Sequence, residues 1–319
     1  MPLLPSSFHP PALLANGHVQ TILPAILRRR HCLGVERERL ELDDGDFLDL
    51  DWARNGHDRL AILSHGLEGC SEDGCIRGTA EALRSAGWDV LAWNLRGCGK
   101  EPNRLLRSYH SGETGDLGAV IRCAAASHSR IALVGFSLGG NVTLKYLGEA
   151  RPHPAVIGGA AISVPIDLAG SAQALDQRWA NRIYVRHLMK RLAKSVLKKA
   201  QRFPGQLEVS RAMRTFRAFD DRYTAPINGF RDAADYWQQA SSRQYLNGIT
   251  VPTLLVNARN DPFLSEECFP VVEAERNPHL YLEVPASGGH VGFIDLARGL
   301  RPWFERRLVE FLTPLASAT

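Results

Sequence analysis

Short apolar runs alternate with segments of helical periodicity through the first half of the chain. The apolar runs, each next to glycine or proline, lie at residues 60–66, 88–97, 130–137 and 155–165. Segments with apolar residues at helical spacing lie between them, at residues 78–87, 113–127 and 141–150. Strands and helices in alternation form parallel sheets that are covered on both faces. The pattern therefore predicts an α/β fold with a mostly parallel central sheet.

A pair of strands is predicted ahead of this alternation. Residues 35–54 alternate between polar and apolar positions on either side of Asp43-Asp44-Gly45-Asp46. Two alternating runs around a turn-forming sequence are typical of two strands joined by a turn.

The alternation stops after residue 165. From residue 166 to about 248 the chain reads as helices and loops rich in arginine, lysine and glutamine. Strand-like runs return at 249–259 and 278–285, and a helical pattern at 301–315 closes the chain. A helical block this late in a sheet indicates a cap over the strand ends. We predict one domain in which a helical cap, residues 166–246, is inserted into a core made of residues 1–165 and 247–319.

Composition narrows the class of protein. The chain has 319 residues, of which 45% are hydrophobic and 23% are charged, as in ordinary globular proteins. Its net charge of +4 is too small to indicate a nucleic-acid partner. Because no run of about 18 apolar residues occurs, we expect no membrane-spanning helix.

The N-terminal residues and the cysteines indicate the cellular compartment in which the protein is expected. Residues 1–30 carry their basic cluster after the apolar stretch, the reverse of a secretory signal peptide. The six cysteines are scattered, with no Cys-x-x-Cys pair. We therefore predict a cytoplasmic protein with free thiols. The spacing of Cys70, Cys75 and nearby histidines fits no structural zinc pattern, so we predict no metal and no other cofactor.

One serine lies in a turn that demands small neighbours. The sequence Gly135-Phe136-Ser137-Leu138-Gly139-Gly140 joins a predicted strand to a predicted helix. A strand–serine–helix turn crowds the positions two residues before and after the serine, and both are glycine here. The serine is then strained, at a helix N-terminus that favours negative charge. Ser137 is therefore the candidate nucleophile; the alternative is a solvated serine in a glycine-rich turn.

The partners of a serine nucleophile are predicted from chain order. Serine needs a base, which a carboxylate orients. In this architecture the acid and then the histidine follow the serine, each after a strand. Asp261 follows the run 249–259, and His290 follows the run 278–285 in a glycine-flanked loop. We predict that Ser137, Asp261 and His290 form a catalytic triad. The other acids that we weigh are Asp220, Asp221, Asp235 and Asp295, the last on an expected helix.

Two backbone N–H groups are predicted to form an oxyanion hole. One should belong to the residue after the nucleophile, Leu138, and the other to a loop after an early strand. The loop His65-Gly66-Leu67 follows such a strand, so the Leu67 N–H is the second candidate. Losing one such donor lowers turnover by roughly 10²–10³. We expect His65 to position this loop rather than to act as the base.

These motifs, in this order, resemble the α/β-hydrolase superfamily. They are SHGLEG (64–69), NLRGCG (94–99), GFSLGGN (135–141), NARNDP (257–262) and GGHVGF (288–293). Three others are similar to the YheT-like group of that superfamily: NGHVQTILP (16–24), YHSGETGDL (109–117) and FDDRYTAPINGFRDAADYW (219–237). The resemblance extends from about Phe8 to the C-terminal helix.

The resemblance implies an α/β-hydrolase fold and a Ser-Asp-His carboxylic ester hydrolase, with the triad on Ser137, Asp261 and His290. The group is related to abhydrolase-domain lipases of animals and to ethanol acyltransferase/esterases of yeast. The expected substrate is a small-molecule ester, either with a short or medium acyl chain or of a lipid. No chemical role is assigned to Asn16-Gly17-His18 or to Asp220-Asp221, which we expect to brace the N-terminal segment and the cap against the core.

Residues 182–202 combine apolar residues at helical spacing with eight basic residues and no acidic one. Such a helix can lie on an anionic membrane. We favour a cap helix whose apolar side packs on the core and whose basic side faces solvent. A nucleic-acid partner is less expected, because no stacking aromatics or known binding module accompany the charge. The sequence does not predict an oligomeric state.

Two alternatives to ester hydrolysis remain. His290 and Asp295 have the spacing of HxxxxD acyltransferases, and an acyl-serine enzyme transfers its acyl group when an alcohol outcompetes water. Acyl transfer to an alcohol is therefore the second hypothesis. A non-catalytic binding protein is the third, because a fold alone does not determine a function.

Overall fold

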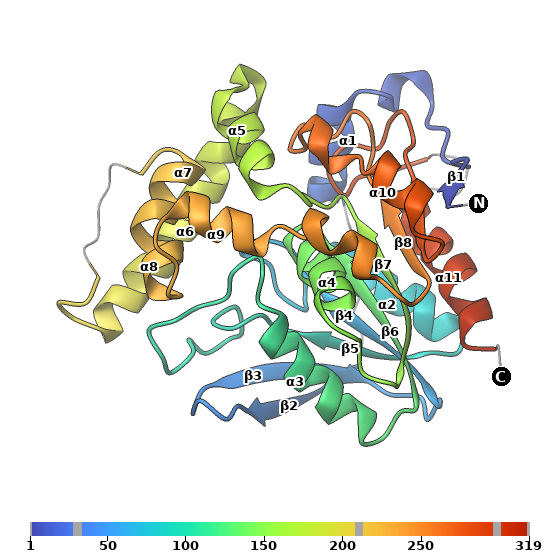
Figure 1. The fold of residues 1–319 in the computed structure, drawn as a ribbon, viewed down its shortest axis with the longest axis horizontal. Helices are drawn as coiled ribbons and strands as arrows, with labels where there is room; N and C mark the ends of the chain where they lie inside the picture. The colour runs from blue at the N-terminus through green and yellow to red at the C-terminus, as the bar shows by residue number, and fades with distance from the viewer. Residues whose placement is uncertain (1, 28–33, 208–212, 296–300, 318–319) are drawn as a thin grey trace.

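A single sheet forms the centre of the molecule. In the computed structural model, which describes residues 2–27, 34–207, 213–295 and 301–317, nine strands follow the order β1-β9-β8-β7-β6-β4-β5-β3-β2 (Figure 1). Neighbouring strands are parallel except for β2–β3 and β3–β5. This confirms both the mostly parallel sheet and the predicted strand pair. The strands are β1 (Leu3–Leu4), β2 (Glu36–Glu41), β3 (Phe47–Ala53), β4 (Arg59–Ser64), β5 (Asp89–Trp93), β6 (Arg130–Phe136), β7 (Val156–Ile162), β8 (Thr253–Val256) and β9 (Leu280–Glu283).

Helices cover both faces of this sheet, as predicted. One face is covered by α2 (Gly74–Ser85) and α11 (Trp303–Leu315), and the other by α3 (Thr114–Ala125), α4 (Leu138–Glu149) and α10 (Val271–Arg276). Because each central strand is buried on both sides, its sequence is apolar at successive positions and does not alternate.

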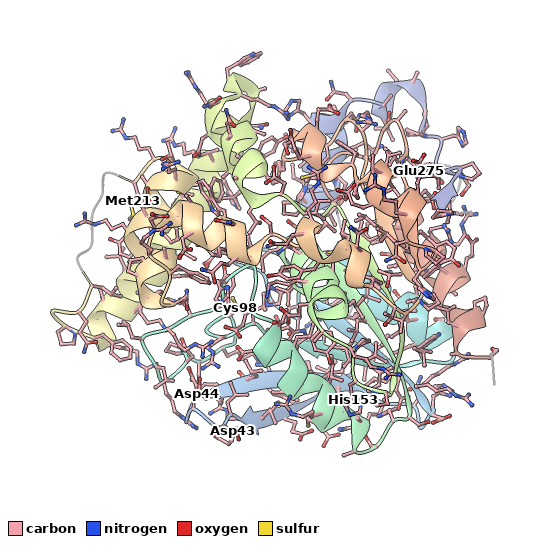
Figure 2. The ribbon with its side chains drawn as sticks, in the orientation of Figure 1. Asp43, Asp44, Cys98, His153, Met213 and Glu275 are labelled. Atoms are coloured by element: carbon pink, nitrogen blue, oxygen red, sulfur yellow. The ribbon has the colours of Figure 1, made fainter. Side chains whose placement is uncertain are left out.

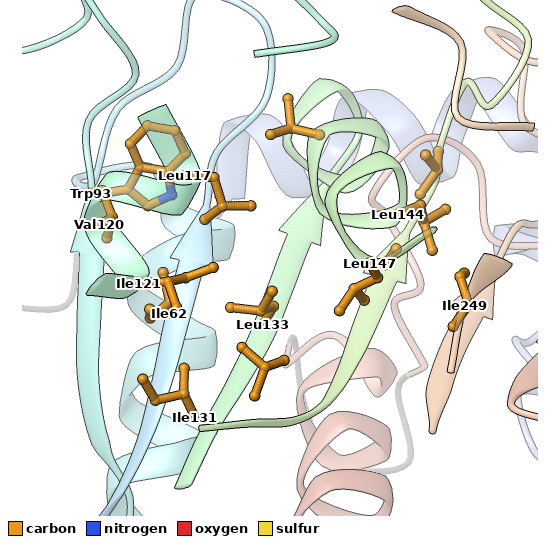
Figure 3. Close-up of a cluster of buried hydrophobic side chains, with 14 of the residues drawn as sticks. Ile62, Trp93, Leu117, Val120, Ile121, Ile131, Leu133, Leu144, Leu147 and Ile249 are labelled. Carbon is orange, nitrogen blue, oxygen red and sulfur yellow. The ribbon is translucent and has the colours of Figure 1, made fainter. Parts of the chain in front are cut away.

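Strand β4 illustrates this double burial. Leu60 and Ile62 belong to the apolar cluster beneath α3 and α4, whereas Ala61 and Leu63 belong to the cluster beneath α2 and α11. Figure 3 shows the first cluster, in which Ile62 and side chains from the neighbouring strands meet those of α3 and α4. The two clusters hold the strand ends, and the loops that follow them, in fixed positions.

The chain between β7 and β8, which contains the segment predicted as a cap, is helical and gathers to the left of the sheet in Figure 1. One side of α6 is buried against Phe219 and Tyr223 of the cap through Val185, Met189, Leu192 and Val196. Its basic residues lie mostly on the exposed side, as we favoured for residues 182–202, but its apolar side packs mainly on other cap residues and not on the core as we expected. The cap helices are α5 (Leu168–Gln177), α6 (Arg182–Arg202), α7 (Phe216–Phe219), α8 (Ala225–Ile227) and α9 (Ala233–Ala240), with a π-helix at Asp220–Thr224.

The N-terminal segment has structure that the sequence did not predict. It forms α1 (Gly17–Leu27), which contains Pro24, and β1, which pairs in parallel with β9 at the sheet edge. Between them Phe8 packs against Phe293 and Trp303, with ring centroids 5.5 and 5.6 Å away. These contacts attach the first residues of the chain to its last third.

The described cysteines are free thiols, as expected, at Cys70, Cys75, Cys98, Cys123 and Cys268. Cys32 lies outside the described residues. Burial raises the pKa of the Cys98 thiol, which lies between the cap and the sheet (Figure 2). In the described parts of the chain no helix has the length and apolar character needed to cross a membrane. No three His, Cys, Asp or Glu residues within those same parts are grouped to hold a metal ion.

Asp295 does not lie on a helix, contrary to our expectation. The preceding residue, Ile294, forms an isolated bridge with Pro302. Its N–H donates to Gln20 Oε1 at 2.8 Å, and its carbonyl oxygen accepts from Gln20 Nε2 at 3.0 Å. The backbone groups that a helix would use are therefore engaged with α1.

Candidate active site

Ser137 has a backbone conformation that only its small neighbours allow. It joins β6 to α4 with φ of +52° and ψ of −118°, a region that residues other than glycine rarely adopt. A Cβ on Gly139 would lie 2.4 Å from the carbonyl oxygens of Ser64 and His65. A Cβ on Gly135 would lie 2.3 Å from the Gly139 carbonyl oxygen. The two glycines therefore permit the tight turn that presents the serine above the sheet edge.

Side chains from three distant parts of the chain meet beside this turn. His290 Nε2 lies 2.9 Å from Ser137 Oγ, and His290 Nδ1 lies 2.8 Å from Asp261 Oδ2. The Asp261 side chain is 0% exposed and the His290 side chain 11% exposed. A carboxylate accepts hydrogen bonds only, so the Nδ1 proton faces Asp261 and Nε2 is left to accept the Ser137 hydroxyl. The structure thus brings together the three residues predicted as a triad.

Neighbouring groups hold the acid and the imidazole in place. Asp261 Oδ1 accepts a hydrogen bond from the Phe263 N–H at 2.9 Å. The Phe263 ring in turn stacks on the His290 ring, with centroids 4.1 Å apart and planes inclined by 21°. The imidazole therefore has little freedom to rotate away from Ser137.

The other acids that we weighed have different partners. Asp221 Oδ1 accepts from the Ala233 N–H at 2.8 Å, and Asp235 Oδ1 accepts from Gln239 Nε2 at 2.9 Å, both inside the cap. Asp220 also bonds within the cap, as described below, so Asp220-Asp221 joins parts of the cap to one another and does not brace the cap against the core as we expected. Despite the HxxxxD spacing, His290 Nδ1 pairs with Asp261 and not with Asp295.

The loop after β4 lies against Ser137. A Cβ on Gly66 would be 3.4 Å from Ser137 Cβ. Within the described residues, no group accepts a hydrogen bond from the N–H of Leu67 or Leu138. Both residues line the cleft that contains Ser137. These are the two N–H groups that the sequence suggested for an oxyanion hole.

His65 holds this loop. Its Nδ1 lies 2.8 Å from the Gly66 carbonyl oxygen, and its Nε2 accepts from the Leu95 N–H at 3.0 Å. Burial lowers the pKa of His65, which favours the neutral ring with one donor and one acceptor nitrogen. Both nitrogens are thus used in positioning the loop, as expected.

A cleft of about 990 Å³ opens above these groups. Its size is at the upper end of the range for small-molecule sites. The cap side of the cleft is largely apolar, with Leu175, Leu192, Phe216, Phe219, Tyr223 and Trp237 among its lining residues. The core side contributes Gly66, Leu67, Ser137 and His290. The cleft can therefore hold an apolar chain beside Ser137.

The loop that carries His290 is held from outside by the N-terminal segment. Thr21 Oγ1 accepts a hydrogen bond from the His290 N–H at 2.9 Å. Asn260, next to Asp261, accepts from the Gly289 N–H at 3.1 Å and donates to the Ala15 carbonyl oxygen at 2.7 Å. Thr21 and Asn260 were missed as site residues, because only their positions in space connect them with His290 and Asp261.

The motif Asn16-Gly17-His18 acquires a structural explanation here. A Cβ on Gly17 would lie 2.1 Å from the Asn260 carbonyl oxygen, so glycine lets α1 approach the acid loop. Asn16 Oδ1 accepts from the His18 N–H at 2.9 Å at the start of the helix. His18 Nδ1 lies 3.0 Å from the Tyr184 hydroxyl of the cap. As the expected bracing role requires, the motif joins core, cap and N-terminal segment.

A comparison with known protein families identifies the family to which this chain belongs. Residues 62–296 match the family described as "alpha/beta hydrolase fold". The chain belongs to this family. The match covers the α/β-hydrolase elements from β4 through the His290 loop, and it confirms the fold class predicted from the motifs.

Relatives and solved structures agree with this α/β-hydrolase assignment. The chain is 35% identical to the Escherichia coli protein named "Putative esterase YheT", over 98% of this chain and 95% of that protein. It is 26% identical to the mouse protein named "Phospholipase ABHD3", over 92% of this chain and 75% of that protein. The Pyrococcus furiosus esterase Pf2001 matches its fold with a TM-score of 0.60 and 22% identity, over 88% of this chain and 93% of that one. The predicted kinship with the YheT-like group is thereby confirmed.

Asp220 is a buried carboxyl group in the cap of this α/β-hydrolase and lines the cleft. Its Oδ1 accepts from the Thr224 hydroxyl at 2.6 Å and its Oδ2 from Trp237 Nε1 at 2.8 Å. Burial raises the pKa of Asp220 from 3.8 to about 7. Both partners are neutral, so they compensate only part of the cost of burying the charge.

Because of Asp220, we expect the free energy of unfolding to depend on pH. Between the pKa of the unfolded chain and about 7, the folded protein binds a proton that the unfolded chain has lost, so the free energy of unfolding falls as pH rises through this window. The contribution of Asp220 amounts to about 4 kcal/mol at most. Asp220→Asn is expected to remove this component and to raise the melting temperature relative to wild type above pH 7. Equal differences between the two proteins at pH 5 and pH 8 would contradict this assignment.

Proposed function

We propose that the protein is a carboxylic ester hydrolase in which Ser137, His290 and Asp261 act as nucleophile, base and orienting acid. One observation carries the proposal. The Ser137 hydroxyl, the His290 imidazole and the Asp261 carboxylate form an unbroken series of contacts at 2.9 and 2.8 Å, in an open cleft. Relatives named as an esterase, a phospholipase and a monoacylglycerol lipase support ester hydrolysis as the reaction.

In the first half of the proposed reaction, Ser137 Oγ attacks the ester carbonyl carbon while His290 Nε2 takes the hydroxyl proton. Asp261 stabilises the imidazolium that forms. The tetrahedral intermediate collapses when the bond to the alcohol oxygen breaks, and His290 returns its proton to that oxygen. The products of this half are a free alcohol and an acyl group on Ser137.

In the second half, water replaces the alcohol. His290 takes a proton from the water as its oxygen attacks the acyl carbon, and the proton passes to Ser137 Oγ when the acyl bond breaks. The N–H groups of Leu67 and Leu138 are the proposed donors to the oxyanion in both halves. Their lack of an acceptor among the described residues supports this role.

The apolar cap side of the cleft favours esters with a medium-length acyl chain. Leu175, Leu192 and Phe219 lie there, and an acyl chain in contact with them would gain about 0.8 kcal/mol per buried methylene. A yeast relative that is 29% identical over 80% of this chain is named "Medium-chain fatty acid ethyl ester synthase/esterase 2". We therefore propose medium-chain acyl esters as the preferred substrates.

A series of p-nitrophenyl esters from acetyl to palmitoyl tests this proposal. We expect kcat/KM to rise with chain length to a maximum at medium chains and then to fall. Hydrolysis of none of these esters by the folded protein would contradict the proposed activity. A maximum at acetyl would contradict the acyl-chain assignment alone.

Acyl transfer to an alcohol is the second candidate, favoured by the synthase activity in the name of the yeast relative. The same acyl-Ser137 intermediate would serve, with an alcohol in place of water. Hydrolysis of an octanoyl ester in the presence of ethanol is then expected to yield ethyl octanoate in addition to octanoate. If increasing ethanol produced no ethyl ester, this candidate would be excluded.

Thr21 offers a test of positioning by the N-terminal segment. Thr21→Val removes the acceptor of the His290 N–H bond and nearly preserves side-chain shape. We expect kcat to fall by about tenfold to a hundredfold, because small misplacements of a base are costly, while KM changes little. Thr21→Ser keeps the hydroxyl and should restore most of the loss. If Thr21→Val retained the wild-type kcat, the positioning role would be wrong.

A further inference from the structure

Exposed apolar side chains gather on two neighbouring helices. Of nine exposed large apolar residues in the described parts of the chain, five lie on α1 or around the start of α6. Ile26, Trp179 and Ile183 are 72%, 81% and 64% exposed. An apolar grouping of this kind on a surface commonly marks an interaction site. We call this group the mouth patch: Val19, Ile22, Ile26, Trp179 and Ile183.

The mouth patch borders the entrance of the cleft. Ile22, Ile26 and Ile183 line the cleft and are also exposed to solvent. The two helices meet where His18 Nδ1 lies 3.0 Å from the Tyr184 hydroxyl and the two rings stack. Val19, Ile22 and Ile26 follow the i, i+3, i+7 spacing of one helix face. A surface that contacts the patch would therefore face the entrance to Ser137.

A row of basic residues continues from the patch along α6. Arg182, Arg186, Lys190, Lys194 and Lys198 recur at every fourth position, and all are exposed. Each step of four residues turns by only about 40° around the helix, so these residues form one stripe, which we call the basic stripe. None of them has an acidic partner within ion-pair distance among the described residues. Around the helix axis, Ile183 lies within the range of angles that the basic stripe covers.

Acidic residues are absent from the two sequence segments that carry the mouth patch and the basic stripe. None occurs in residues 1–35 or in residues 178–207. The sequence neighbours of the mouth patch therefore include apolar and basic residues but no acidic ones. Such a surface is complementary to a partner in which negative charge covers an apolar layer. An anionic lipid bilayer has this structure.

The buried side of α6 decides how such a contact could form. Val185, Met189, Leu192 and Val196 pack inside the cap, so the apolar side of the helix cannot enter a membrane without unfolding the cap. The contact must instead use the exposed mouth patch and basic stripe. This differs from an amphipathic helix that inserts its own apolar face.

We propose that the mouth patch and the basic stripe dock the protein on an anionic lipid bilayer, with the cleft entrance facing the lipid. The proposal rests on the proposed function and adds the source of its substrate, a lipid ester that passes from the bilayer to Ser137. A second copy of the chain is a poorer occupant, because symmetric pairing through the patch would bring two basic stripes together.

Sedimentation with vesicles tests the docking. We expect wild-type protein to bind phosphatidylcholine vesicles that contain phosphatidylglycerol, to bind pure phosphatidylcholine vesicles far less, and to lose binding as salt is added. Lys190→Gln combined with Lys194→Gln should weaken binding about twenty-fivefold, since each basic side chain near an anionic surface contributes about fivefold. Trp179→Ser should weaken it about tenfold.

Matched variants outside α1 and α6 provide the controls. Arg151→Gln with Arg276→Gln removes two exposed charges, and Val272→Ser removes an apolar side chain that is 52% exposed. Both controls should bind vesicles like wild type. Trp179, Lys190 and Lys194 do not line the cleft, so hydrolysis of soluble p-nitrophenyl acetate should stay unchanged in their variants.

Three results would overturn the docking proposal: no binding to anionic vesicles, equal losses in the control variants, or a dimer in sedimentation velocity that Trp179→Ser dissociates without any vesicle binding. The last result would assign the patch to a second copy. Normal vesicle binding by a protein that hydrolyses no ester would instead contradict the proposed function and support the docking.

Discussion

Replacing Ser137 with alanine is expected to lower kcat for a medium-chain p-nitrophenyl ester by about 10⁶. The hydroxyl lies 2.9 Å from His290 Nε2, and without it no acyl-enzyme forms. The remaining activity would come from binding and from the backbone N–H groups. A fluorophosphonate should label the wild-type protein covalently and should not label the variant.

Ser129→Ala is the matched control for this prediction. Ser129 precedes the opposite end of β6, so its loss should leave both turnover and labelling at wild-type levels. Full activity of Ser137→Ala would end the assignment of this serine as nucleophile. A folded wild-type protein that hydrolyses no ester and takes up no label would favour the non-catalytic binding protein that we considered from the sequence.

Asp261→Asn is expected to lower kcat by about 10⁴ with little change of shape. The buried carboxylate accepts the Nδ1 proton of His290 at 2.8 Å. An amide can turn its NH₂ group toward Nδ1, which then has to accept, and the proton moves to Nε2. In that tautomer the imidazole has no lone pair facing Ser137, so it is unable to take the hydroxyl proton.

The competing acids provide the controls for Asp261→Asn. Asp235→Asn and Asp295→Asn should keep kcat within a few-fold of wild type, because His290 contacts neither residue in the arrangement found here. A collapse of activity in Asp295→Asn with full activity in Asp261→Asn would reverse the assignment. It would favour the acyltransferase interpretation of His290 and Asp295.

The local parts of the site were predictable from the sequence. Glycine was expected at positions 135 and 139 because a Cβ at either position collides with backbone in a strand–serine–helix turn. In the structure a Cβ at these positions would lie only 2.3 and 2.4 Å from backbone carbonyl oxygens. The strands were predictable because those in the centre of the sheet are buried on both faces and are therefore continuously apolar. Residues that follow these strands must emerge at one sheet edge, which is why chain order alone brought Asp261 and His290 into consideration.

The non-local parts of the site were not predictable. Thr21 contacts the backbone of His290 across 269 residues of sequence, and no periodicity or spacing connects them. The N-terminal segment contains a motif that is similar to the YheT-like group. The requirement for glycine at position 17 became clear only when α1 was found to pack against Asn260. Likewise, the pattern of residues 182–202 predicted a buried apolar side of α6 but not the segments that cover it, since these depend on how the whole cap packs.

The sequence by itself determined the elements of the core and the chemically competent side chains, because backbone sterics and strand burial act over a few neighbouring residues. Only the tertiary structure decided which acid faces the imidazole, how α1 supports the loop that carries it, and which apolar residues remain exposed at the cleft entrance. Those outcomes depend on contacts between segments far apart in the chain, whose geometry follows from the packing of the whole core and cap.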